Sequence, residues 1–125
     1  MIVDTNALSA WRDGDSALLR VIGVAGLLIL PVVSVGEYFY GLRNSRRRTE
    51  NEAWLNRIVE ALRVAPVTLE TAGVYASIMS ILDRTGRPIP ANDIWIAALA
   101  LQHRLPVLSR DAHFDSVDGL TRVSW

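Results

Sequence analysis

Four carboxylic acids stand where predicted strands or extended segments give way to helices. Asp4 directly follows the short apolar run MIV, and Glu37 lies in the first turn of the helix expected after the apolar run LLIL. Asp93 begins a helix after an extended Pro-Ile-Pro segment, and Asp111 follows PVLS after one arginine. Sites in open parallel α/β folds form at the carboxyl ends of the strands. We therefore expect these four acids, which are distant in the sequence, to meet in the folded chain.

Crowded carboxylates need a compensating cation. The partial positive charge at a helix start contributes about 0.3 to 1 kcal/mol per acid, which does not offset the repulsion among three or four of them. Mg²⁺ and Mn²⁺ are hard ions that prefer oxygen ligands. A divalent ion held by carboxylates can polarise a phosphoryl oxygen and activate a water molecule. Phosphodiester hydrolysis is therefore the leading interpretation of the four acids.

Three of the acids also have a purely structural interpretation. Glu37 stands three residues after Ser34, which is the spacing of a capping box. Asp93 could be an acid in the first turn of an amphipathic helix, and Asp111 could be a turn or cap residue. Asp4 is harder to explain in this way, because it ends a strand of only three residues.

The composition excludes several other chemistries. The chain has no cysteine, and a count of its 13 basic residues shows that all are arginine. This rules out disulfides, thiolate metal sites, thiol nucleophiles, Schiff-base lysines and a P-loop lysine. The absence of cysteine and the small number of histidines, two, argue against zinc. His103 and His113 are interpreted as surface or helix-end residues. The absence of cysteine allows a reducing compartment, and we expect the protein in the cytoplasm.

The elements that must position the acids alternate along the chain. The 125 residues suit a single domain spanning 1–125. The most apolar stretch, 21–36, is too short for a membrane span and contains three glycines and a proline, so it is assigned to the core and no membrane association is expected. Short apolar strands alternating with helices predict an α/β three-layer sandwich, a short parallel sheet with helices on both faces. Strands are expected at residues 1–3, 27–30, 63–67, 106–109 and 120–125, and helices at 4–11, 15–24, 34–41, 49–62, 68–86, 92–103 and 112–117.

Four segments then carry a family resemblance. IVDTNAL, SVGEYFYGLRNS, PIPANDIWIAALALQ and LPVLSRDAHFDSVDGL resemble, in order, the motifs of the PIN domain, and specifically of the VapC toxins of bacterial toxin–antitoxin pairs. The resemblance covers the whole chain. It implies the PIN-like form of the three-layer sandwich, with an acidic pocket that holds Mg²⁺ or Mn²⁺ and cleaves RNA.

The resemblance also assigns roles to the acids. Asp4 and Asp93 would be the main metal ligands, and Glu37 would orient or deprotonate the attacking water. Asp111 would lie in the outer shell or bind a second ion. In the metal-free pocket, at least one of these four catalytic candidates is expected to have a pKa well above its usual value, as crowded carboxylates do.

RNA binding also requires positive charge near the pocket. The segment GLRNSRRRTE carries four arginines just past the helix that bears Glu37, and guanidinium groups bind phosphates bidentately. These arginines could equally be a solvated loop, or could contact an antitoxin. Two polar residues, one near each end of the chain, resemble family positions that steady the acids by hydrogen bonds. The candidate substrate-binding residues are Asn6, Ser109, Arg43, Arg46, Arg47 and Arg48.

The resemblance further implies partners: a VapB-like antitoxin and a second copy of the chain, giving a homodimer and a heterotetramer or larger complex with the antitoxin. Two alternatives within the family are a PIN nuclease of RNA processing and a non-catalytic PIN module that binds RNA or protein. The presence of all four acids argues against the second. A phosphatase of the receiver-like or haloacid-dehalogenase-like type would need a lysine or an Asp-x-Asp pair after the first strand, and the chain has neither.

Overall fold

A parallel sheet of five short strands lies at the centre of the fold, in a computed structural model that describes residues 1–125. The strand order is β3-β2-β1-β4-β5, and every neighbouring pair is parallel. The strands are β1 (Ile2–Val3), β2 (Ile29–Pro31), β3 (Arg63–Ala65), β4 (Val107–Leu108) and β5 (Arg122–Val123). Because β1 is the middle strand, the residue that follows it emerges at the centre of the carboxyl edge.

Successive residues of each strand face opposite sides of the sheet, as the pleat requires. Ile2 aligns with Ile29 of β2 and with Val107 of β4, and all three belong to one buried hydrophobic cluster. The next residue of each of these strands belongs to a second cluster on the other face. The sheet is therefore buried on both sides, which explains why its strands are continuous apolar runs.

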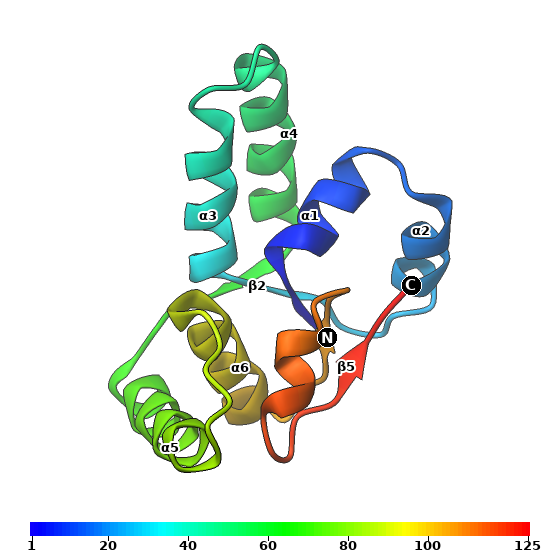
Figure 1. The fold of residues 1–125 in the computed structure, drawn as a ribbon. Helices are drawn as coiled ribbons and strands as arrows, with labels where there is room; N and C mark the ends of the chain where they lie inside the picture. The colour runs from blue at the N-terminus through cyan, green and yellow to red at the C-terminus, as the bar shows by residue number, and fades with distance from the viewer.

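Helices cover both faces of the sheet (Figure 1). The first cluster is completed by α5 (Leu69–Thr85), α6 (Ala91–His103) and the short 3₁₀ helix η1 (Ala112–Ser116). The second is completed by α1 (Thr5–Arg12), α2 (Ser16–Gly23), α3 (Val32–Leu42) and α4 (Arg48–Ala61). The predicted three-layer sandwich is confirmed. None of the helices has the length and apolarity needed to cross a membrane.

The expected elements are all present, with shifted bounds at several ends. Asp4 and Asp15 cap α1 and α2 through their carboxylates, and Gly86 ends α5 with a left-handed φ of 64°, which suits glycine. The second strand begins two residues later than predicted, and the last strand is reduced to two residues. The helix expected from Ser34 begins at Val32, directly after Pro31.

Helices α3 and α4 pair as a hairpin that extends away from the sheet (Figure 1). Three aromatic residues pack where the hairpin meets α1. The Tyr38 ring on α3 lies 5.8 Å from the Trp54 ring on α4, and Trp54 meets Trp11 of α1 edge-on at 6.3 Å. This cluster fixes the hairpin against α1 and so sets the position of the α3 face that borders the carboxyl edge of the sheet.

Candidate active site

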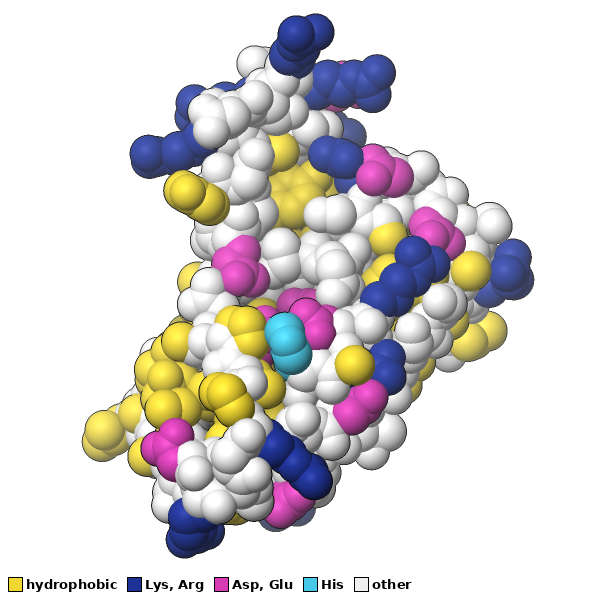
Figure 2. All heavy atoms as spheres, in the orientation of Figure 1, with side chains coloured by type: hydrophobic (Ala, Val, Ile, Leu, Met, Phe, Trp, Pro, Cys, Tyr) yellow, Lys and Arg dark blue, Asp and Glu magenta, His cyan; other side chains and the backbone are white.

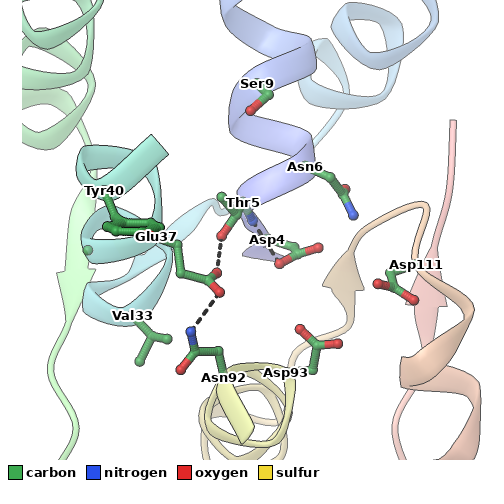
Figure 3. A pocket seen from close by; sticks show the side chains of 11 residues that line it. Asp4, Thr5, Asn6, Ser9, Val33, Glu37, Tyr40, Asn92, Asp93 and Asp111 are labelled. Atoms are coloured by element: carbon green, nitrogen blue, oxygen red, sulfur yellow. Dashed lines mark hydrogen bonds between the residues drawn. The ribbon is translucent and has the colours of Figure 1, made fainter. Parts of the chain in front are cut away.

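A single open pocket of about 780 Å³ lies at the carboxyl edge of the sheet. Asp4, Glu37, Asp93 and Asp111 all line it, so the structure brings the four predicted acids together (Figure 3). They come from the end of β1, from α3, from the first turn of α6 and from the segment after β4. On the molecular surface the acids gather around a central hollow, beside a histidine (Figure 2).

Asp4 is the most enclosed of the four acids, with 5% of its surface exposed. Its Oδ1 accepts a hydrogen bond from the backbone N of Thr5 at 2.7 Å, and its Oδ2 accepts one from Ser109 Oγ at 2.7 Å. Burial raises the pKa of Asp4 to about 6; these hydrogen bonds oppose the rise, and repulsion by Asp93 and Glu37 adds to it. The expected high pKa is therefore present, although burial contributes more to it than crowding does.

Ser109 holds Asp4 as part of a partly buried polar network. Its Oγ donates to Asp4 and accepts hydrogen bonds from Asn6 Nδ2 at 2.9 Å and from the backbone N of Asp111 at 2.9 Å. Asn6 Oδ1 in turn accepts a hydrogen bond from the backbone N of Arg110 at 3.3 Å. This network links the start of α1 to the segment after β4, and it accounts for both polar residues as groups that orient the acids.

Glu37 does not form the capping box that its spacing from Ser34 suggested. Helix α3 begins after Pro31 with no side-chain cap, and the Ser34 hydroxyl is buried without a partner. Glu37 instead points into the pocket, where it accepts hydrogen bonds from the Thr5 hydroxyl and from Asn92 Nδ2, the latter at 2.7 Å (Figure 3). The carboxylate is thus held by α1 and α6 while it projects from α3.

Asp93 and Asp111 share a histidine at the rim of the pocket. His113 Nδ1 lies 2.9 Å from Asp93 Oδ2 and 3.0 Å from Asp111 Oδ1. The backbone N of His113 also donates to Asp111 Oδ1 at 2.9 Å, because Asp111 caps η1. Burial raises the pKa of Asp93, and the hydrogen bond to His113 partly offsets that rise.

Two of these contacts were missed by the sequence analysis. The sequence predicts no role for Asn92, and His113 is exposed, as predicted, but also contacts two of the acids. The signals that could have found them are their positions: Asn92 immediately precedes Asp93, and His113 follows Asp111 by two residues. The other histidine, His103, ends α6 and does not line the pocket, as expected.

The donor set suits a divalent cation. None of the four acids forms an ion pair with an arginine, and His113 is their only potentially positive partner. Asp93, Asp111 and His113 each offer one ligand atom within 4.8 Å of the others. Carboxylate oxygens around a pocket open to water are the environment in which Mg²⁺ and Mn²⁺ are held. The residues present therefore fit a hard divalent ion.

The predicted arginine run is divided between two sides of the α3–α4 hairpin. All four arginines are exposed, at the end of the hairpin where basic side chains gather in Figure 2. Arg43 and Arg48 line a depression of about 270 Å³ beside the pocket, and Arg48 pairs with Glu52 at 2.7 Å. Arg47 lines a different depression, and Arg46 lines neither.

Comparison with known proteins gives consistent matches along the chain. The family model of the PIN domain matches residues 1–120. Ribonuclease VapC5 of Mycobacterium tuberculosis (strain ATCC 25618 / H37Rv) is 28% identical over 125 residues, which span 98% of this chain and 90% of that protein. VapC ribonuclease Y4jK of Sinorhizobium fredii (strain NBRC 101917 / NGR234) is 31% identical over 134 residues, or 99% of this chain and 96% of that protein.

Solved structures show the same fold. VapBC2 from Rickettsia felis, bound to a DNA fragment from its promoter, aligns with a TM-score of 0.88 at 18% identity, over 99% of this chain and 97% of that chain. VapBC-5 from M. tuberculosis, a member of the VapBC family of toxin-antitoxin systems, aligns with a TM-score of 0.71 at 24% identity, over 98% and 94% of the two chains.

Proposed function

This chain belongs to the PIN domain family, as its motifs predicted, and we propose that it is a VapC-type toxin that hydrolyses RNA with the help of Mg²⁺ or Mn²⁺. One observation carries the proposal: Asp4, Glu37, Asp93 and Asp111 line a single pocket in which no arginine compensates their charge. The two relatives described above are named VapC ribonucleases, which supports RNA as the substrate.

The proposed roles follow from how each acid is held. When bound, a divalent ion polarises a phosphoryl oxygen and lowers the pKa of a water molecule. Asp4 and Asp93 would hold the ion, as the family resemblance implies; both line the pocket, and Asp93 also belongs to the group of possible ligands that it forms with Asp111 and His113. Glu37 would orient the attacking water, because Thr5 and Asn92 fix its carboxylate in the pocket. Asp111 would act from the outer shell or bind a second ion.

The proposal includes protein partners. Solved relatives of the same fold are VapBC complexes of toxin-antitoxin systems. By this likeness the chain would bind a VapB-like antitoxin and would form a homodimer, giving a heterotetramer or larger complex. Co-purification with the product of the neighbouring reading frame, followed by a mass measurement in solution, tests both interactions; a monomer that binds no such product would contradict them.

The central test is RNA cleavage by purified protein with Mg²⁺, with Mn²⁺ and with EDTA. We expect cleavage with either ion and none with EDTA. Asp4→Asn and Asp93→Asn should abolish cleavage while remaining folded. Asp83→Asn is the matched control, because Asp83 is an exposed acid on α5 that does not line the pocket. Equal cleavage in EDTA, or full activity of the Asp4 and Asp93 variants, would refute the proposed chemistry. An absence of cleavage under every condition would favour a non-catalytic PIN module.

A further inference from the structure

A solvent-exposed aromatic residue stands at the rim of the acidic pocket. Tyr40 lies on α3 one helical turn after Glu37, and 78% of its surface is exposed. It lines the acidic pocket and also the neighbouring depression beside the arginines. No hydrogen bond or aromatic partner occupies its side chain, in contrast to Tyr38, which packs on Trp54. In Figure 3 the Tyr40 ring lies at the edge of the site, beside the Glu37 side chain.

The surface between the acids and the arginines is open. Gly36 lines both the pocket and the depression, and a Cβ atom added there would meet nothing within 4 Å. Arg43 also lines the depression and forms no ion pair, whereas Arg48 is neutralised by Glu52. Glu37 and Tyr40 on α3 and Arg43, the residue that directly follows α3 with helical backbone angles, are spaced three residues apart. At about 1.5 Å per residue, Arg43 lies roughly 9 Å beyond Glu37 along the helix axis.

We propose that Tyr40 is a stacking platform for one unpaired base of the RNA, next to the phosphate bound at the acids, and that Arg43 binds a phosphate beyond that base. This inference rests on the proposed function. The order of these groups matches the order of groups in a single strand of RNA. The acids would hold an ion-bound phosphate, the Tyr40 ring would stack on the next base, and the Arg43 guanidinium would bind the phosphate after that base. At about 3.4 Å per stacked nucleotide, the span accommodates about two to three nucleotides.

Stacking on Tyr40 selects a class of RNA. A base within a duplex is already stacked and cannot place its face on the ring, so loops, bulges and single strands should be the substrates. Aromatic stacking is tolerant of base identity, because every base has a π-face. Tyr40 should therefore contribute affinity and position without fixing the sequence that is cut.

The test uses a short fluorescein-labelled single-stranded RNA of mixed sequence, bound to protein made inactive by Asp93→Asn. Tyr40→Ala should weaken binding about 5- to 150-fold, which corresponds to the roughly 1–3 kcal/mol of one stacked base. Tyr40→Phe and Tyr40→Trp should retain the affinity, and Tyr40→Leu should behave like Tyr40→Ala because it keeps apolar bulk but lacks a π-face. Leu69→Ala is the control, since Leu69 is 90% exposed on α5 and does not line the pocket. Melting temperatures show whether each variant is folded.

A second measurement locates the base. Abasic nucleotides are introduced one position at a time, and each RNA is tested with the inactive protein that retains Tyr40 and with the inactive protein that also carries Tyr40→Ala. At one position near the cleaved bond, the abasic RNA should bind both proteins equally, because the stacking partner is already missing. Additive losses at every position would overturn the proposal, and so would full affinity in Tyr40→Leu.

The outcomes separate this inference from the proposed function. The unsubstituted protein could cleave RNA with Mg²⁺, and the Tyr40→Ala variant could bind and cleave RNA equally well. This result would support the proposed RNA hydrolysis and refute the stacking platform. If Tyr40→Ala loses affinity for an antitoxin but not for RNA, the ring serves a protein partner and the proposal fails. If RNA binding depends on Tyr40 but no metal ion supports cleavage, the platform stands and the proposed chemistry fails.

Discussion

Replacing Asp4 by asparagine should stabilise the metal-free protein at neutral pH while destroying the proposed ion site. The pKa of Asp4 is about 6 in the folded chain, against an ordinary value of 3.8. Each unit of difference is worth about 1.4 kcal/mol, so the ionised carboxylate costs the folded state about 3 kcal/mol. Asparagine has nearly the shape of the neutral carboxyl group and carries no charge, so it removes this cost.

The effect has a defined dependence on pH. Because the folded-state pKa is raised, the folded chain binds the Asp4 proton more tightly than the unfolded chain does. The corresponding stability is fully present below about pH 4 and is lost as the pH rises through about 6. Asp4→Asn should therefore match the unsubstituted protein near pH 4 and exceed its free energy of unfolding by about 3 kcal/mol near pH 8. For a chain of this size, that corresponds to a rise of roughly 10 °C in melting temperature.

The measurement is urea unfolding in EDTA at several pH values between about 4 and 8. Asp83→Asn serves as the control, because it removes an exposed acid and should give a small, nearly constant difference. A destabilised Asp4→Asn protein near pH 8, or a stability difference that does not change with pH, would refute the conclusion that burial of the Asp4 carboxylate opposes folding.

Three other outcomes follow from contacts at the site. Mg²⁺ should raise the free energy of unfolding of the unsubstituted protein, by about 2.7 kcal/mol at a concentration one hundred times Kd, and should leave that of Asp4→Asn nearly unchanged. Equal rises in the melting temperatures of the two proteins would place the ion elsewhere. Ser109→Ala should lower the free energy of unfolding by about 1–3 kcal/mol, because Asn6 Nδ2 and the backbone N–H of Asp111 lose their buried acceptor. An unchanged free energy of unfolding in urea would contradict this network. Arg43→Ala should reduce the slope of the logarithm of the RNA-binding constant against the logarithm of salt concentration by about 0.7, the amount expected for one phosphate contact on a single strand. Arg46→Ala should leave this slope nearer its original value. Equal changes in the two variants would contradict the division of the arginine run.

The overall fold was accessible from sequence because its signals are local. The apolar runs around Ile2, Ile29 and Val107 predicted buried strands, and the polar residues that follow the first run predicted the start of α1. The start of α3 was misplaced because Ser34 offered a good cap spacing, whereas the chain turns into the helix directly after Pro31. Proline suits such a start, since its φ is already near the helical value.

The site was only partly accessible, because its details depend on distant contacts. The four acids could be selected from the rule that sites form where strands end. The hydrogen bond from Asn92 to Glu37 joins residues 55 apart, and the contact of His113 with Asp93 joins residues 20 apart. Neither spacing predicts the contact itself, although each residue stands within two positions of a candidate acid in the sequence. The exposure of Tyr40 was equally hidden, because an aromatic residue on an apolar helix is ordinarily assigned to the core.

The central position of β1 limits how the site can move. Its two residues contribute to different hydrophobic clusters, and the backbone N of Asp4 still donates to Leu108 O at 3.2 Å in the neighbouring strand. Separating Asp4 from the sheet would disrupt both cores at once, so we expect this acid to lie in the part of the chain that unfolds last. Amide hydrogen exchange should therefore be slow at Asp4 and faster at the exposed loop that joins α3 to α4.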